Sequence, residues 1–278
     1  MKKKERASAL IRTVVLALIS ILFILPLVWM VLSSLKTTPE VFARPFHWLP
    51  NKFQWHNYPD VWSTGAEVNM LRSYYNSLYI VLFSIVGQLL IASLAAYAFA
   101  KINFKGKNII FMLFLSSMMI PSQVTIIPRF ILFRTIGLYN NLWAIILPAW
   151  FGATSIFMLR QFYIGLPSDL MEAAKIDGAG HLRIFAQIML PLTKAALVSL
   201  IILAFISSWN EYLSPLIFLP SKKLFTVAQA IQSYMQDEFK QHNLTMAAAT
   251  SAIVPVAILF IAGQKYFVEG IATSGVKG

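Results

Sequence analysis

The sequence predicts an all-α membrane protein with six transmembrane helices. Its 278 residues are 58% hydrophobic and only 12% charged, and the mean hydropathy is +0.68. A soluble domain of this length carries about 25% charged residues, which is roughly twice the share found here. Because a charge that faces lipid hydrocarbon costs several kcal/mol, the shortfall indicates a surface that is exposed to lipid.

Six segments are apolar over the roughly 20 helical residues that a bilayer core requires. They are Thr13–Leu35, Tyr75–Ala100, Ile109–Phe130, Leu142–Phe162, Ala195–Leu219 and Met246–Tyr266. The first segment follows a run of three lysines, which is also how a signal peptide begins. Its apolar run is longer than the roughly 7–15 residues of a signal peptide, and no small-x-small cleavage site follows. We therefore expect a retained helix.

The basic residues favour a cytoplasmic location for both termini. With the N-terminus inside, more of the 23 lysine and arginine residues fall in inner than in outer segments, as the positive-inside rule requires. The expected organisation is a cytoplasmic N-terminus at 1–12, a first transmembrane helix at 13–35, an outer loop at 36–74 and a core of five further spans at 75–268. A cytoplasmic loop at 163–194 interrupts this core, and a cytoplasmic tail at 269–278 follows it.

Composition and motifs exclude several other classes of protein. The net charge of +12 is spread over short loops rather than gathered on a soluble domain, which argues against nucleic-acid binding. The chain has no cysteine, and its four histidines lie in separate loops without metal-ligand spacing. No G-x-x-x-x-G-K-[ST] phosphate loop occurs. We therefore expect no catalytic residue, metal or cofactor in this chain, and no enzyme activity.

Two of the expected outer loops are rich in aromatic and polar residues. Residues 37–74 contain several tryptophans and prolines, and residues 220–243 contain the polar stretch Gln232–Glu238. Tryptophan and tyrosine commonly form a belt at the membrane interface. The same residues also suit a docking surface for an external partner, and the sequence leaves both interpretations open.

The most informative segment is the cytoplasmic loop between the fourth and fifth expected spans. Ser168 is a good N-cap for a first short helix. Gly178 and Gly180 suit a chain reversal, since glycine tolerates a positive φ. A second short helix is expected over His181–Leu190, ending at Pro191. Two short helices joined at a glycine corner suit insertion into a groove of a partner protein.

The spacing within this loop resembles the EAA signature of ABC importer permeases. Glu172-Ala173-Ala174 is followed after three residues by Gly178, and after nine more by Ile188-x-Leu190-Pro191. The resemblance implies a type I ABC importer permease fold in which the loop is a coupling helix seated in a cytoplasmic ATPase. It assigns this contact to Glu172, Ala173, Ala174, Asp177 and Gly178. An acidic residue there can pair with an ATPase arginine. A purely structural hairpin is the alternative.

Other phrases resemble one branch of that family, the carbohydrate-uptake permeases of the maltose transporter's smaller membrane-subunit type. They are Asn57-Tyr58 to Val61-Trp62, Ser208–Leu216, Gln264–Gly270 and Gly275–Gly278. One departure is Ser214, where the branch more often has an aromatic residue. The resemblance implies a heterodimer with a homologous permease, two ATPase subunits that bind ATP and Mg, and an extracytoplasmic solute-binding protein. It also implies a sugar as the substrate and the bacterial plasma membrane as the location.

Polar residues inside the expected spans are candidates for the substrate path, because such residues are costly in lipid and usually face a cavity or a partner. These candidates are Gln123 in the third span and Trp209, Asn210, Glu211 and Tyr212 in the fifth. Neighbours on a helix point about 100° apart, so we expect Asn210 to face the pore and Glu211 to turn toward another helix. Hydrogen bonding between helices is the alternative role.

Two further expectations concern gating and energy coupling. Tyr97, near the inner end of the second span, is a candidate gate. A secondary sugar transporter driven by an ion gradient is the alternative function from another class. Glu211 would then be the coupling carboxylate, although such transporters usually have internal repeats and more spans.

Overall fold

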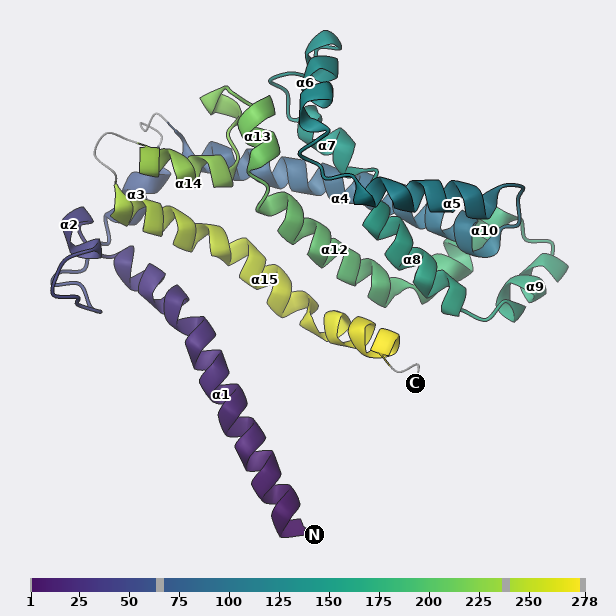
Figure 1. Cartoon of the computed structure of the whole chain (residues 1–278), viewed down its shortest axis with the longest axis horizontal. Coiled ribbons are helices and arrows are strands. Elements are labelled where there is room, and N and C mark those ends of the chain that lie inside the picture. The colour runs from purple at the N-terminus through teal and green to yellow at the C-terminus, as the bar shows by residue number, and fades with distance from the viewer. Residues whose placement is uncertain (1, 64–67, 237–240, 276–278) are drawn as a thin grey trace. The chain divides into compact units, whose positions relative to one another are not determined.

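The computed structural model describes residues 2–63, 68–236 and 241–275, and the side chains of residues 8–63, 68–235 and 241–264. Asp237 and Glu238 of the expected polar outer stretch lie outside the described residues. So do the last three residues of the expected tail. The described residues contain helices and no strand (Figure 1), so the all-α prediction is confirmed.

The helical elements follow one another with short connections. They are α1 (Lys2–Ser33), α2 (Thr38–Val41), α3 (Asn57–Trp62), α4 (Met70–Lys101), α5 (Lys107–Ser116), η1 (Ser117–Met119), α6 (Ile126–Thr135), α7 (Trp143–Ala149), α8 (Ala153–Gly165), α9 (Asp169–Ile176), α10 (His181–Ile184), η2 (Phe185–Met189), α11 (Leu190–Leu192), α12 (Lys194–Trp209), α13 (Leu213–Phe218), η3 (Lys222–Leu224), α14 (Val227–Gln236) and α15 (His242–Gly275).

The chain forms two compact units. One contains residues 1–71 and 230–254, and the other contains residues 72–229 and 255–278. In the first unit, α1 is a single unbroken helix although Pro26 lies inside it (Figure 1). None of the side chains in its most apolar stretch is buried. A helix that is apolar and exposed over its whole length requires lipid or another subunit around it.

Four helical stretches of the described residues are long and apolar enough to cross a membrane. They are Ser8–Ser33, Met70–Lys101, Trp143–Gly165 and His242–Gln264. A fifth is obtained if His181–Leu192 and Lys194–Trp209, which are bent by 76° relative to each other, count as one broken span. These stretches overlap the first, second, fourth, fifth and sixth expected spans.

The third and fifth expected spans differ from the prediction because both are interrupted. The helix that begins at Lys107 ends at Met119, and it is shorter than a full span. Ile120 is extended, with ψ 115°, immediately before Pro121, and helix resumes only at Ile126. The residue before a proline is biased away from the helical region, which accounts for this break. The fifth span likewise breaks between Trp209 and Leu213.

The larger unit has a core in which α4, α8 and α12 meet the 169–190 segment. Side chains of all these elements form one buried apolar cluster, and Figure 1 shows α12 beside α8, in agreement with their contacts. At the opposite end of α4, Asn76 Nδ2 donates to the carbonyl oxygens of Lys223 and Phe225, each at 3.0 Å. The long α4 therefore connects two ends of the unit.

A close approach between α4 and Trp150 gives the first prediction. Trp150 Nε1 donates to the carbonyl oxygen of Phe83 at 3.0 Å, and the indole lies directly over Gly87. A Cβ atom at residue 87 would overlap this ring, so Gly87→Ala should lower the free energy of unfolding by about 1–3 kcal/mol. Thermal unfolding in detergent checks this. The control is Gly165→Ala, where an added Cβ meets no atom within 4 Å; equal losses in both variants would refute the prediction.

Candidate functional site

The turn into α9 is held by α4. Lys101 Nζ donates to the carbonyl oxygen of Leu166 at 2.6 Å and to Ser168 Oγ at 3.4 Å. Ser168 occupies the N-cap position, but its side chain makes no capping bond, which corrects the expectation. Its φ of −75° and ψ of −22° are already helical, whereas a capping side chain requires extended backbone.

The glycine corner after α9 is a Schellman motif. Gly178 N–H donates to the carbonyl oxygen of Lys175 at 3.0 Å, and Ala179 N–H donates to that of Ala174 at 2.9 Å. This pattern requires a left-handed residue at its centre, and Gly178 has φ +80°. Gly180 differs from the expectation, because its φ of −73° and ψ of 165° are extended and it begins α10.

The EAA residues divide between two faces of α9. Ala174 is buried together with Met171 in the core cluster shared with α4 and α8. Positions three apart lie on one helix face, so Ala174 seats α9 on this chain rather than on a partner. Glu172 and Ala173 are exposed. Beside them Ile176 is 87% exposed, which makes the outward face both apolar and acidic.

The second part of the loop runs through Pro191 instead of ending there. Helix α10 continues as a π-helical turn, η2, and then as α11 to Leu192. Pro191 is the second residue of α11 and follows the π-helical turn, so the helical run ends at Leu192, two residues after the expected end. Leu182 in α10 is 76% exposed, so an exposed apolar side chain lies on each of the two short helices.

Tyr97, the candidate gate, connects this loop to α4. Its side chain is buried, and its hydroxyl lies 3.2 Å from His181 Nδ1. Its ring contacts those of Tyr163 and Phe185, with centroids 6.2 and 5.4 Å away. The residue therefore joins α4, α8 and the 181–192 helices inside one packed cluster.

A second feature of the larger unit is a cavity of about 360 Å³ between α4, α6, α7, α12 and α13. Two of the predicted path residues, Gln123 and Glu211, line it. Hydroxyl groups of Ser84, Ser122 and Ser208 share the lining. The cavity thus combines amide, carboxylate and hydroxyl groups, which are the groups that hydrogen-bond polar ligands.

Arg129 is the cation of this cavity. Its Nη2 donates to Ser214 Oγ at 3.2 Å, and its guanidinium lies 4.8 Å from the centroid of the Phe218 ring. The Glu211 carboxylate attracts it electrostatically. Among the described residues, Arg129 Nε and Ser84 Oγ are buried without a hydrogen-bond partner. Buried polar atoms normally have partners, so these two atoms retain unused hydrogen-bonding capacity beside the cavity.

The helix break after Trp209 reverses the expected directions of Asn210 and Glu211. The Asn210 amide donates to the carbonyl oxygen of Ile206 at 2.9 Å and does not line the cavity. Glu211 lines it, while its Oε1 accepts the N–H of Ser214 at 2.8 Å. Because residue 211 is no longer helical, the 100° rule does not describe the pair.

The two aromatic candidates lie apart from the cavity lining. Trp209 is buried, with its ring stacked on Phe205 at 5.6 Å and edge-on to Tyr74 at 5.5 Å. Tyr212 is half-buried and immediately precedes α13. Neither is among the residues that line the cavity.

The smaller unit brings the two expected outer loops together. Thr38 Oγ1 donates to Asn243 Oδ1 at 2.5 Å, and Asn243 Nδ2 donates to Asn57 Oδ1 at 3.0 Å. A capping box begins α2, in which the Thr37 N–H donates to Glu40 Oε2 at 3.0 Å. The pKa of Glu40 is lowered, and the largest cause is this hydrogen bond from the Thr37 backbone. Described parts of the two expected outer loops, residues 36–62, 230–236 and 241–243, therefore lie together, and we call them the outer surface after their expected location.

The sequence profile of the family described as "Binding-protein-dependent transport system inner membrane component" matches residues 88–273. This match covers α9 with its glycine corner, the 181–192 helices and the cavity-lining part of α12. The chain belongs to this family. It is accordingly a membrane-embedded permease component and not an enzyme.

Individual relatives extend the match over almost the whole permease. It is 35% identical over 268 residues to the arabinooligosaccharides transport system permease protein AraQ of Bacillus subtilis, covering 96% of this chain and 95% of that protein. It is 32% identical over 265 residues to the sn-glycerol-3-phosphate transport system permease protein UgpE of Pectobacterium atrosepticum, covering 94% of each.

A solved structure shares the fold of the permease. One chain of a bacterial ABC transporter involved in the import of the acidic polysaccharide alginate superposes with a TM-score of 0.80 at 22% identity, over 95% of this chain and 98% of that chain. The resemblance to ABC importer permeases, and with it the type I fold, is confirmed.

Sequence reasoning missed several residues of these sites. Arg129 was not among the predicted path residues, although it lies at the end of the third expected span, where a charged residue is itself a signal of a functional position. Ser84 and Ser208 carry no such signal, because serine is common inside transmembrane helices. The exposure of Ile176 and Leu182 could not be predicted from the sequence, because it depends on which faces of α9 and α10 pack against the core cluster.

Proposed function

We propose that this permease moves a neutral oligosaccharide or related glycoside across the bacterial plasma membrane. The cavity beside Glu211 and Arg129 carries the proposal. Its one guanidinium is balanced by its one carboxylate, and the remaining polar groups are uncharged hydroxyls and an amide. Such a lining matches a ligand rich in hydroxyl groups, which both donates and accepts hydrogen bonds without adding net charge.

The relatives are consistent with this substrate class. AraQ is described as part of an arabinooligosaccharide system, and UgpE as part of a system for sn-glycerol-3-phosphate. A phosphate ester is an anion and requires an uncompensated cation at its site. The Arg129 guanidinium already faces a carboxylate, so the charge balance favours the neutral sugar over the phosphate.

The proposed assembly is a heterodimer with a homologous permease, a pair of cytoplasmic ATPases and an extracytoplasmic solute-binding protein. The exposed apolar length of α1 favours a second membrane subunit. The exposed face of α9, with Glu172, Ala173 and Ile176, suits the ATPase groove. The outer surface suits the binding protein. ATP and Mg bind to the ATPases, so this chain contributes no cofactor.

This assembly fixes the proposed orientation. Both termini and the 163–194 loop are cytoplasmic, and 36–74 faces outward. The division into segments 1–12, 13–35, 36–74, 75–268 and 269–278 belongs to the same proposal.

Two helices connect the coupling loop with the cavity, because each contributes residues both to the core cluster that holds α9 and to the cavity lining. Helix α4 contributes Tyr97 to the cluster that holds α9 and Ser84 to the cavity. Helix α12 contributes Leu200 to the cluster and Ser208 to the cavity. A packed cluster transmits displacement as a unit because it has few voids. Movement of α9 with the closing ATPases therefore shifts α4 and α12 together, and access to the cavity alternates between the two sides.

Uptake measurements in a strain that expresses the complete transporter test this function. We expect accumulation of a labelled neutral oligosaccharide, lost when the ATPase is inactivated by mutation. Excess unlabelled oligosaccharide should compete with it, whereas excess sn-glycerol-3-phosphate should not. Uptake that survives loss of the ATPase and collapses with a protonophore would instead establish the ion-coupled alternative. Competition by the phosphate alone would overturn the substrate class.

A further inference from the structure

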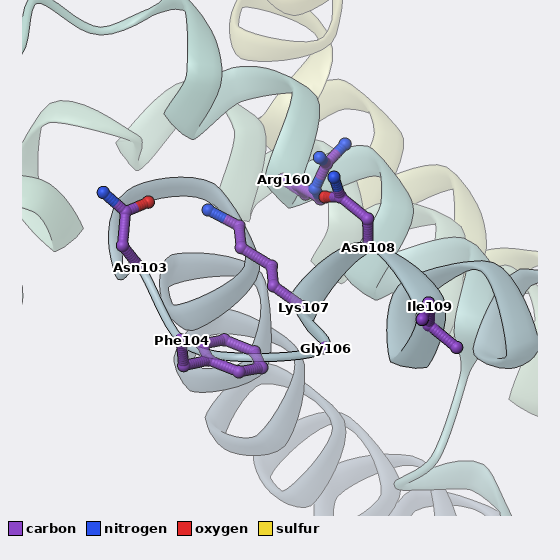
Figure 2. Close-up of a pocket in the computed structure, with 7 residues that line it drawn as sticks. All are labelled: Asn103, Phe104, Gly106, Lys107, Asn108, Ile109 and Arg160. Atoms are coloured by element: carbon purple, nitrogen blue, oxygen red, sulfur yellow. The ribbon is translucent and has the colours of Figure 1, made fainter.

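A second cavity, remote from the proposed substrate path, lies where α4 ends and α5 begins. Its volume is about 560 Å³, and it is lined by Asn103, Phe104, Gly106, Lys107, Asn108, Ile109 and Arg160. Figure 2 shows the Lys107 side chain directed into it between the Asn103 amide and the Arg160 guanidinium, with the Asn108 amide beside that guanidinium. We call it the basic cavity.

Both cations of the basic cavity, Lys107 and Arg160, have N–H donors that are not used within the described residues. Arg160 Nε donates to the carbonyl oxygen of Phe99 at 3.2 Å, and the guanidinium lies 4.1 Å from the centroid of the Phe111 ring. These contacts fix the group and leave its two terminal nitrogens without partners among the described residues. Lys107 Nζ makes one long bond, of 3.4 Å, to the carbonyl oxygen of Ala100. No carboxylate of the described ranges forms an ion pair with either cation.

Two cations that share a cavity without a carboxylate form a site for an anion. The start of α5 adds the positive end of its helix dipole. Gly106 makes this geometry possible, because its φ of +81° lets the chain turn sharply into α5. The two asparagine side chains offer amide donors at the rim, so the lining can bond several oxygen atoms of one group.

The surface beside the basic cavity is apolar. Ile109, Met112 and Leu113 on α5 are each between 67% and 68% exposed, and Phe104 is 39% exposed. A free phosphate ion gains nothing from such a surface, whereas a phospholipid places its acyl chains on it. The adjoining end of α4 also holds the turn into α9 through Lys101, so in the proposed orientation the basic cavity lies at the cytoplasmic leaflet.

We propose that the basic cavity binds the phosphate of an anionic phospholipid headgroup. Lys107 and the terminal nitrogens of Arg160 bond the phosphate oxygens, and the acyl chains lie along the exposed face of α5. Basic pockets at the cytoplasmic ends of transmembrane helices suit anionic lipids, because that leaflet is negatively charged. The bound lipid would also cover the α5 face, which is exposed in the described part of the chain.

Native mass spectrometry of the assembled transporter, purified with phosphatidylglycerol in a neutral detergent, tests the lipid site. Lys107→Gln should retain the lipid at least about tenfold more weakly, as expected for the loss of one charge-assisted hydrogen bond to a phosphate oxygen. Lys107→Arg should retain it as the unaltered protein does. The matched control is Lys105→Gln, which removes the same charge from an exposed lysine two residues away that does not line the cavity.

Two further results separate the sources of phosphate. Phosphatidylglycerol should raise the unfolding temperature of the transporter, while phosphatidylcholine and inorganic phosphate should not. Equal stabilisation by inorganic phosphate would show a site for a soluble anion and overturn the lipid assignment. Equal lipid retention in Lys107→Gln and Lys105→Gln would show that the lipid binds elsewhere, and would also overturn it. None of these readouts depends on which sugar is transported.

Discussion

Glu172→Lys and Gly178→Asp should each reduce sugar uptake to background while the protein stays in the membrane. Glu172 lies on the exposed face of α9, so its reversal in charge acts on the partner and leaves the core cluster intact. Gly178→Asp places a side chain and a negative charge at a residue with φ +80°, a conformation that glycine adopts without steric strain. It should thereby disturb the Schellman motif that joins α9 to α10 and the charge of the face beside Glu172.

Matched variants separate coupling from folding in this experiment. Gly180→Asp places the same side chain two residues later, where the backbone is extended and an added Cβ meets no atom within 4 Å. Aspartate is favourable at that N-cap position, so uptake should persist. Glu172→Gln keeps the shape of the side chain and should lose only part of the activity. Uptake and co-purification of the ATPase are measured together, and normal transport by either disruptive variant would refute the coupling role of α9.

Glu211→Gln should lower sugar uptake by about tenfold or more, whereas Asn210→Ala should change it by less than about twofold. The Glu211 carboxylate faces the cavity and balances Arg129 there. A hydrogen bond to a charged group contributes about 1.5–3 kcal/mol, which corresponds to a factor of at least about ten. Asn210 instead bonds the carbonyl oxygen of Ile206 on its own helix.

The comparison is informative because glutamine keeps the bond to the Ser214 N–H. Glu211→Gln therefore preserves the start of α13 and removes only the charge. The ATPase activity stimulated by the binding protein should persist in both variants, since α9 is unchanged. Uptake and ATPase activity in proteoliposomes are measured side by side. A larger loss in Asn210→Ala than in Glu211→Gln would show that the sugar path passes Asn210 and not Glu211, and would contradict this assignment.

Local patterns in the sequence determined the helical class, the approximate spans and the loop between the fourth and fifth expected spans with its glycine corner. Each depends on residues close in the chain. Apolar runs set the spans, and the spacing from Glu172 to Pro191 identified the family. The positive φ of Gly178 follows from a helix that ends at Ile176 and then reverses, which requires only the neighbouring carbonyls of Ala174 and Lys175.

Tertiary structure alone decided which side chains meet. Ala174 turned inward because the core cluster of α4 and α8 receives that face of α9, which leaves Glu172 and Ala173 outside. Arg129 reached Glu211 because the breaks at Pro121 and after Trp209 redirect α6 and α13 toward one cavity. A periodic pattern gives the directions of side chains only while the helix continues. Where it breaks, the local bond from the Ser214 N–H to Glu211 and the packing of Phe218 determine them. The packing partners of Phe218 include Arg129 and Phe133, which lie more than eighty residues earlier in the chain and which the local sequence does not specify.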